Sequence, residues 1–148
     1  MLTSNILLKN AENFPNEPAI SIKDSNKDWQ TDTWNDLKDH VFKISKSLIH
    51  LGINPNDKIS IYSYNRKEWS YVYAATQMIR SVSVGVYHTC SPEEVNWIVS
   101  NSTSKIVFVG HNPSDNGEKD RMPINRILPI LDSLDGVEKV VLMEGIES

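Results

Sequence analysis

The stretch SVGVYHTCSPEEV, residues 83–95, places a histidine and a cysteine two positions apart. His88 and Cys90 are residue types that serve as base, nucleophile or metal ligand. Cys90 stands just before an expected helix start, a position that favours a reactive thiolate. A spacing of two on an extended segment does not by itself allow proton transfer, and no acidic residue is evident to orient His88. The residues therefore favour an inert side chain at Cys90, and we expect no catalytic residue in this chain.

A zinc site is also disfavoured by the spacing of the possible ligands. Zinc needs three or four protein ligands, which usually come in CxxC or HxxxH pairs. Neither spacing occurs among the candidates, which are His40, His50, His88, His111 and Cys90. We therefore expect no metal site, and we place His40 and His50 on the solvated face of a helix.

The chain has no phosphate-binding loop that a sequence motif would reveal. It contains neither G-x-G-x-x-G nor a Walker A sequence, and its six glycines are dispersed. The expected strands end in YSYN, YHTC and VGHN, without the acidic residues of a phosphorylatable receiver domain. We therefore expect the chain to bind no cofactor by itself.

The first third of the sequence predicts a β-hairpin followed by a long helix. The runs AISIK (19–23) and WQTDT (29–33) flank a polar turn, as in a hairpin with a short loop. Thr33 and Asp36 have the spacing of a helix N-cap, apolar residues then recur every three or four positions, and Gly52 closes the pattern.

The rest of the sequence alternates strand and helix patterns. Asn65 with Glu68, and Ser91 with Pro92 and Glu94, have the composition of helix starts. A weaker helical pattern covers 124–134, where Pro129 removes a hydrogen bond. The expected strands are 58–64, 82–87, 105–110 and 139–143.

This order predicts an α/β fold with a parallel sheet, helices on both faces and an N-terminal β-hairpin. The β-branched run 82–87 shows little polar alternation, so we expect it to be a central strand covered on both faces. Ligands of such sheets bind beyond the carboxyl ends of the strands. Residues 87–90 directly follow the carboxyl end of one expected strand.

Composition excludes several classes of protein. The chain has 148 residues, enough for one core, and its net charge of −4 comes from scattered charges of both signs. We therefore expect no nucleic-acid partner. The first residues lack the pattern of a signal peptide, no apolar run has the length of a membrane span, and a single cysteine suits a reducing compartment. These features favour a cytoplasmic location.

Three segments carry a resemblance to a known family. SYNRKEW (63–69), SVSVGVYHTCSPEEV (81–95) and SKIVFVG (104–110) resemble the long-chain fatty acyl-CoA synthetases of the AMP-binding, adenylate-forming superfamily. The likeness covers nearly the whole chain. It implies that residues 1–148 are an N-terminal fragment of the large N-terminal domain, inactive alone, because the family's phosphate loop and small C-terminal domain lie further along such chains.

The resemblance implies an ATP-dependent long-chain fatty acid–CoA ligase that uses ATP, Mg²⁺ and coenzyme A. Its partners would be its fatty acid, its nucleotides and the rest of its own chain; peripheral membrane association and a homodimer stay open. The alternative is a self-standing α/β small-molecule-binding or regulatory module on the same scaffold.

The resemblance also bears on two short stretches. In the similar acetyl-CoA synthetases, the positions of Tyr87, His88 and Thr89 help to receive the nucleotide end of coenzyme A. Those enzymes have a glycine pair where this chain has His88 and Thr89, so a simple strand-to-helix turn stays an alternative. Where relatives have a small pair such as Gly-Ala, this chain has Arg80-Ser81, whose bulk puts close helix packing in doubt.

Overall fold

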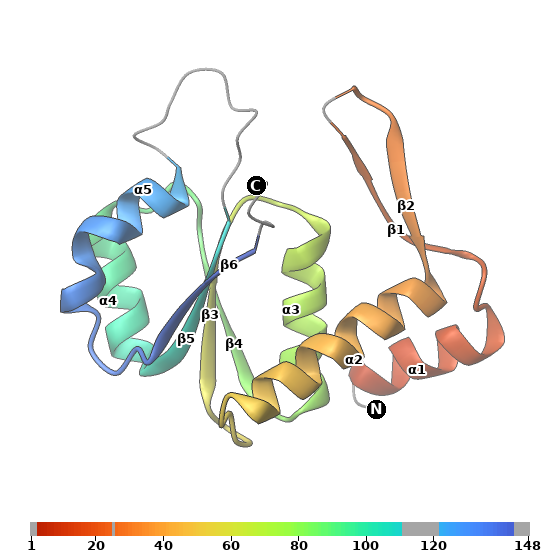
Figure 1. Cartoon of the computed structure of the whole chain (residues 1–148), viewed down its shortest axis with the longest axis horizontal. Helices are drawn as coiled ribbons and strands as arrows, with labels where there is room; N and C mark the ends of the chain where they lie inside the picture. Colours follow the sequence, from red (N-terminus) through yellow and green to blue (C-terminus); the bar gives the residue numbers. More distant parts are fainter. Residues whose placement is uncertain (1–2, 25, 111–121, 144–148) are drawn as a thin grey trace. The chain divides into compact units, whose positions relative to one another are not determined.

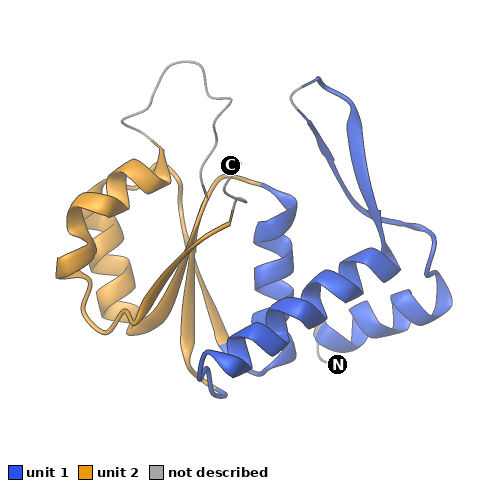
Figure 2. Cartoon of the chain, viewed as in Figure 1, with its two compact units in different colours: residues 1–55, 66–81 blue, residues 56–65, 82–148 orange. Residues whose placement is uncertain are grey.

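The structure of the chain is a computed structural model that describes residues 3–24, 26–110 and 122–143. The chain divides into two compact units (Figure 2). Unit 1 comprises Met1–Pro55 and Arg66–Ser81, and unit 2 comprises Asn56–Asn65 and Val82–Ser148. Each unit has its own set of internal contacts.

Unit 1 consists of three helices and the predicted hairpin (Figure 1). The hairpin strands β1 (Pro18–Lys23) and β2 (Trp29–Thr33) pair in antiparallel fashion, with Ser21 opposite Thr31. The helices are α1 (Thr3–Asn13), α2 (Trp34–His50) and α3 (Lys67–Met78). Val41 and Leu48 of α2 are buried, as the apolar spacing predicted, whereas His40 and His50 are exposed.

A capping box starts α2 where the sequence predicted it. The Thr33 hydroxyl accepts a hydrogen bond from the Asp36 backbone N–H at 3.2 Å, and the Asp36 carboxylate accepts one from the Thr33 N–H at 3.0 Å. The Thr33 side chain and its backbone N–H together lower the pKa of Asp36. Gly52, with φ of 86°, follows the end of the helix in the left-handed region.

The two ends of α3 differ from expectation. The helix begins after Arg66, which makes no side-chain cap, so Asn65 and Glu68 do not form the predicted capping box; Glu68 instead pairs with Arg66 at 2.8 Å. At the other end, Arg80 is exposed and has a φ of 63°, while Ser81 is buried. The exposed Arg80 side chain is therefore not packed against the strand, and its left-handed backbone is a conformation that favours glycine.

Unit 2 is built on a four-stranded parallel sheet in the order β4-β3-β5-β6 (Figure 1). The helix α4 and the α5–η2 segment contribute apolar side chains to its core, together with Tyr62, Val86, Val107 and Val109. The α/β class, the parallel sheet with flanking helices and the separate hairpin are thus confirmed. The elements are β3 (Lys58–Tyr62), β4 (Val82–Val86), α4 (Pro92–Ser102), β5 (Ser104–Val109), α5 (Pro123–Ile127), η2 (Leu128–Ser133) and β6 (Lys139–Leu142).

The predicted helix over 124–134 is two shorter pieces. The α-helix α5 ends at Ile127, and a 3₁₀ helix continues from Leu128. Pro129 lies in the first turn of the second piece. Because proline lacks the backbone N–H that an α-helix interior needs, the chain changes helix type there.

The prediction that 82–87 is a central strand is wrong. In the described sheet β4 is an outer strand, and Val82 is 43% exposed. The inner positions belong to β3 and β5, and β3 buries the polar residue Ser60. The Ser60 hydroxyl shares a hydrogen bond of 2.7 Å with the Ser104 hydroxyl on β5, so burying it leaves no unsatisfied group.

Candidate functional site

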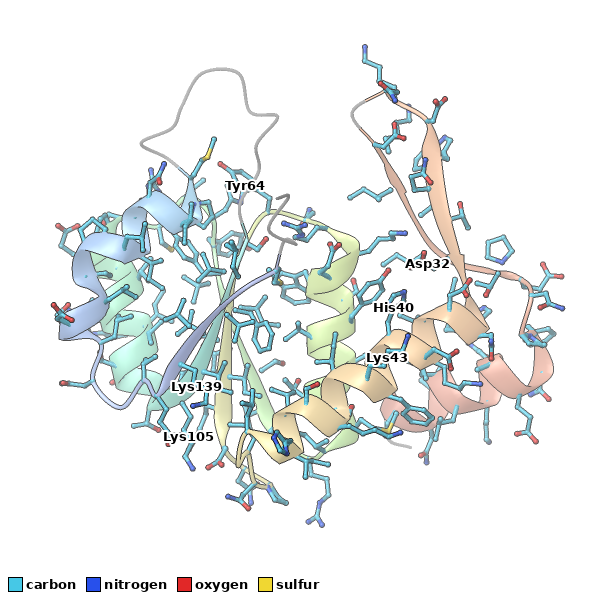
Figure 3. All side chains as sticks on the ribbon, in the orientation of Figure 1. Asp32, His40, Lys43, Tyr64, Lys105 and Lys139 are labelled. Atoms are coloured by element: carbon cyan, nitrogen blue, oxygen red, sulfur yellow. The ribbon has the colours of Figure 1, made fainter. Side chains whose placement is uncertain are left out.

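The carboxyl ends of the parallel strands meet at one edge of the sheet in unit 2. Tyr64 follows β3, Tyr87 and His88 follow β4, and Gly110 follows β5. Figure 3 labels Tyr64 at this edge. Such edges are the usual ligand-binding side of a parallel α/β sheet. The sequence therefore placed the segment 87–90 correctly.

The start of α4 fixes the far end of this segment. The Ser91 hydroxyl accepts a hydrogen bond from the Glu94 N–H at 3.3 Å, and the Glu94 carboxylate accepts one from the Ser91 N–H at 2.8 Å. Pro92 occupies the first helical turn. The predicted cap is confirmed, and it leaves only residues 87–90 to connect strand and helix.

The segment 87–90, called the YHTC loop below, is a tight turn anchored from one side. The Cys90 N–H donates to the Tyr87 carbonyl at 3.0 Å. Arg126 Nη1 donates to the Cys90 and Thr89 carbonyls at 2.6 and 2.7 Å, and more weakly to that of His88 at 3.4 Å. No sequence pattern indicated Arg126, which lies 36 residues or more further along the chain.

The three predicted binding residues lie in different surroundings. Tyr87 is 79% exposed, and Thr89 is also exposed. His88 is half-buried, with its ring centroid 4.2 Å from that of Tyr64 and the ring planes at 33°. The His88 imidazole is thus held against the Tyr64 ring, while the exposed Tyr87 ring is available for stacking on a flat ligand.

Cys90 lacks the surroundings of a catalytic thiol. Its half-buried side chain borders a mainly apolar hollow of about 390 Å³ beside Trp97 and Ile98. Within the described residues, no hydrogen bond joins Cys90 and His88, whose ring packs on Tyr64 instead. The same residues hold no group of three His, Cys, Asp or Glu side chains that could bind a metal; His111 lies outside them.

A second polar cluster lies inside unit 1, where Figure 3 labels Asp32 and His40. Asp32 accepts hydrogen bonds from Lys67 Nζ at 2.6 Å and from the Tyr71 hydroxyl. Burial first, and the Asp32 carboxylate second, raise the pKa of Tyr71. The His40 ring stacks on Tyr71 with centroids 4.6 Å apart. The hydrogen bonds of Asp32 join β2 to α3. Tyr71 is only 5% exposed, so the cluster offers no open site.

No described helix combines the length and apolar character needed to cross a membrane. In unit 2, two exposed aromatic side chains lie near the YHTC loop: Tyr87 is 79% exposed and Trp97 is 68% exposed. The loop is therefore the strongest candidate for a ligand site in the part of the chain that the structure describes.

Comparison with known proteins places this geometry in a family. The family model described as AMP-binding enzyme matches residues 7–147. The mouse long-chain-fatty-acid–CoA ligase ACSBG2 is 26% identical over 143 residues, which are 90% of this chain and 21% of that protein. Acyl-CoA ligase sidI of Beauveria bassiana is 30% identical over 76% of this chain and 19% of its own length.

A shorter relative also matches. The uncharacterized protein Rv1549 of Mycobacterium tuberculosis is 27% identical over 99 residues, which are 67% of this chain and 57% of that protein. The chain thus spans about a fifth of the ligases named above and more than half of this shorter relative.

Solved structures share the fold. The anthranilate CoA ligase AuaEII, in complex with anthranoyl-AMP, has a TM-score of 0.82 at 16% identity over 97% of this chain and 25% of its own. A long-chain-fatty-acid CoA ligase from Rhodopseudomonas palustris, described as putative in its structure, has a TM-score of 0.80 at 20% identity over all of this chain and 34% of its own. With the family match over 7–147, these likenesses lead to one conclusion: the chain belongs to the AMP-binding enzyme family.

Proposed function

We propose that the protein carrying this chain is an ATP-dependent long-chain fatty acid–CoA ligase. The observation that carries the proposal is the family match over residues 7–147, joined to relatives that are named as such ligases. In the proposed reaction a fatty carboxylate attacks the α-phosphorus of ATP, which gives acyl-adenylate and releases pyrophosphate. The coenzyme A thiol then attacks the acyl carbon and releases AMP.

Within this proposal, residues 1–148 are an N-terminal part of the large N-terminal domain, and their partner is the rest of the same protein. We assign ATP and Mg²⁺ to other parts of the protein, as the resemblance to the acyl-CoA synthetases implies. We accordingly expect the chain alone to form no acyl-CoA and to bind no Mg·ATP at micromolar concentration in a calorimetric titration. A cytoplasmic location belongs to the same proposal.

The test of the activity uses the protein that carries this chain and a series of fatty acids from short to long. A long-chain ligase forms one thioester, one AMP and one pyrophosphate per acid consumed, and its kcat/KM rises with acyl length. Acid-dependent pyrophosphate release without any thioester, or a preference for short or aromatic acids, contradicts the assigned substrate.

We further propose that Tyr87, His88 and Thr89 receive the nucleotide end of coenzyme A. The exposed Tyr87 ring is suited to stacking on adenine, and exposed Thr89 is suited to donating a hydrogen bond to the ribose phosphate. The His88 ring, whose centroid lies 4.2 Å from that of Tyr64, carries a ring N–H that can donate to a phosphate oxygen. Their position at the carboxyl edge of the sheet supports this assignment.

A substitution separates this role from the adenylation step. His88→Ala is expected to raise the KM for coenzyme A about threefold to thirtyfold, the effect of losing one hydrogen bond to a charged group. Pyrophosphate release in the first half-reaction should stay near normal. His50→Ala is the matched control, because it removes an exposed histidine from α2 in the other unit. Loss of adenylate formation with unchanged KM for coenzyme A would assign the loop to another ligand.

The second candidate is a self-standing α/β small-molecule-binding or regulatory module. The observation that favours it is the relative Rv1549, of which the chain covers more than half. A module of this kind would be produced without a phosphate loop or C-terminal domain, and it would bind a nucleotide or thioester without turnover. Mass spectrometry of the native protein distinguishes the two candidates by the length of the polypeptide that contains residues 1–148.

A further inference from the structure

Arg126 places a guanidinium directly behind the YHTC loop. Its Nη1 donates to the carbonyls of Cys90 at 2.6 Å and Thr89 at 2.7 Å, with a longer bond of 3.4 Å to that of His88. Three successive carbonyls that converge on one point repel one another through their dipoles. A cation at that point removes the repulsion, and hydrogen bonds from a charged donor are about twice as strong as neutral ones.

Arg126 is itself held in place by the core of unit 2. Arg126 lies in the last turn of α5, next to Ile127, which is fully buried in the core of unit 2. The Cys90 carbonyl also accepts a hydrogen bond from the Tyr62 hydroxyl at 3.1 Å, and the Tyr62 side chain is fully buried on β3. One carbonyl of the loop is therefore held from two elements of the core.

These contacts decide which groups of the loop face away from the core. The carbonyl of Tyr87 is used by the turn, and those of the next three residues are used by Arg126. The exposed side chains of Tyr87 and Thr89 point to solvent from this fixed turn. The positive charge of Arg126 behind the turn also favours the binding of a negatively charged group such as a phosphate.

We infer that Arg126 is a positioning residue for the YHTC loop, which holds the loop backbone in the conformation that binds a phosphate-bearing nucleotide. This inference rests on the proposed role of the loop toward coenzyme A and adds a residue from α5 to it. The hydrogen bonds that Arg126 makes to the loop all go to backbone carbonyls, and its guanidinium also interacts with the Tyr62 hydroxyl, so it acts on the ligand through the loop backbone.

Two variants and one control test the inference. Arg126→Gln keeps a polar side chain but removes the charge, and Arg126→Lys keeps the charge but replaces the planar guanidinium by an ammonium. Lys139→Gln is the matched control, because it removes an exposed cation from β6 of the same unit. Circular dichroism first establishes that each variant keeps the secondary structure, and Arg126→Lys serves if Arg126→Gln does not fold.

The first measurement is the hydrogen exchange of the Cys90 amide by NMR, in the chain of residues 1–148. We expect exchange at least tenfold faster in Arg126→Gln, a smaller increase in Arg126→Lys and no change in Lys139→Gln. The second measurement is the KM for coenzyme A in the protein that carries the chain. We expect it to rise about threefold to thirtyfold in Arg126→Gln with normal pyrophosphate release. Adding His88→Ala should raise it by less than the product of the two single effects.

The outcomes distinguish the inference from the proposed function. Unchanged exchange of the Cys90 amide in Arg126→Gln overturns the anchoring role. Faster exchange with an unchanged KM overturns the link to the ligand, and in that case His88→Ala tells which idea failed. If His88→Ala still raises the KM, only the positioning role of Arg126 is wrong; if it does not, the proposed coenzyme A site is wrong.

Discussion

Replacing Gly110 by alanine tests the packing at the carboxyl edge of the sheet. A β-carbon at this position would overlap the Ser63 hydroxyl and would lie 2.7 Å from Ser63 Cβ and 3.3 Å from its Cα. The hydroxyl can rotate away, but Cβ would have to move by about 0.7 Å to reach the ordinary contact distance of 3.4 Å. Overpacking of this kind typically costs about 1–3 kcal/mol, and we expect about 2 kcal/mol.

Urea unfolding followed by tryptophan fluorescence measures this cost, together with three further variants. Ser63→Ala alone should be neutral or slightly stabilising, because its buried hydroxyl has no hydrogen-bond partner among the described residues. Gly110→Ala should cost less when combined with Ser63→Ala. It should cost almost nothing when combined with Ser63→Gly, because only the contact at 3.3 Å then remains.

The double-mutant cycle between Gly110→Ala and Ser63→Gly is therefore expected to give a coupling of about 1–2 kcal/mol. In thermal unfolding, the single variant Gly110→Ala should lower the midpoint by roughly 4–8 °C for a chain of this length. The reasoning is refuted if Gly110→Ala costs the same with and without Ser63→Gly, or if it costs nothing at all.

Four other substitutions have defined expectations. Asp32→Asn leaves Lys67 without its anionic partner in a site where their side chains are 13% and 18% exposed, and should lower the free energy of unfolding by about 2 kcal/mol in urea titrations; equal stability would contradict this. Tyr71 has a raised pKa in the folded state, so its contribution to the free energy of unfolding is fully present below pH 10 and is lost as the pH rises further. Tyr71→Phe should therefore make the free energy of unfolding fall less steeply above pH 10, and an unchanged slope would contradict this expectation. Arg80→Gly relieves a left-handed backbone with φ of 63° and should stabilise the chain by about 1 kcal/mol in the same titrations, whereas a loss of stability would show that the Arg80 side chain matters. Cys90→Ser should leave thioester formation within about tenfold of normal, a limit of about 1.4 kcal/mol in barrier terms, and a greater loss would restore the thiol as a candidate catalytic group.

The parts of the fold that depend on neighbouring residues could be predicted from the sequence. Thr33 with Asp36, and Ser91 with Glu94, form the capping boxes that their spacing of three indicated. The alternation of strands and helices likewise predicted the parallel sheet, because its connections leave few other arrangements. Two local predictions were wrong: α3 begins at Lys67 with Arg66 in place of Asn65 at the cap position, and the helix predicted over 124–134 changes type at Leu128.

The parts that depend on distant residues could not be predicted. Strand order placed β3 and not β4 inside the sheet, and the buried Ser60 hydroxyl of β3 finds its hydrogen-bond partner in Ser104, 44 residues away. Arg126 reaches the YHTC loop across 36–38 residues, and Lys67 reaches Asp32 across 35. No pattern within a window of one helix or strand contains such pairs.

The position of the candidate site could be predicted from the sequence, but its side-chain contacts could not. A strand end followed by Ser91 and Pro92 located residues 87–90 at the ligand-binding edge. The packing of His88 on Tyr64 and the role of Arg126 appear only in three dimensions. That Tyr87, His88 and Thr89 bind coenzyme A stays a prediction.

The binding of coenzyme A at the YHTC loop is tested by comparing coenzyme A with dephospho-coenzyme A, which lacks the ribose phosphate, in the protein that carries this chain. If His88 and Thr89 contact that phosphate, the normal protein has a lower KM for coenzyme A than for the dephospho form. We expect this preference to disappear largely in the double variant His88→Ala with Thr89→Ala, while the KM for the dephospho form stays within about twofold of normal. An unchanged preference in the double variant would contradict the central claim that the YHTC loop receives the nucleotide end of coenzyme A.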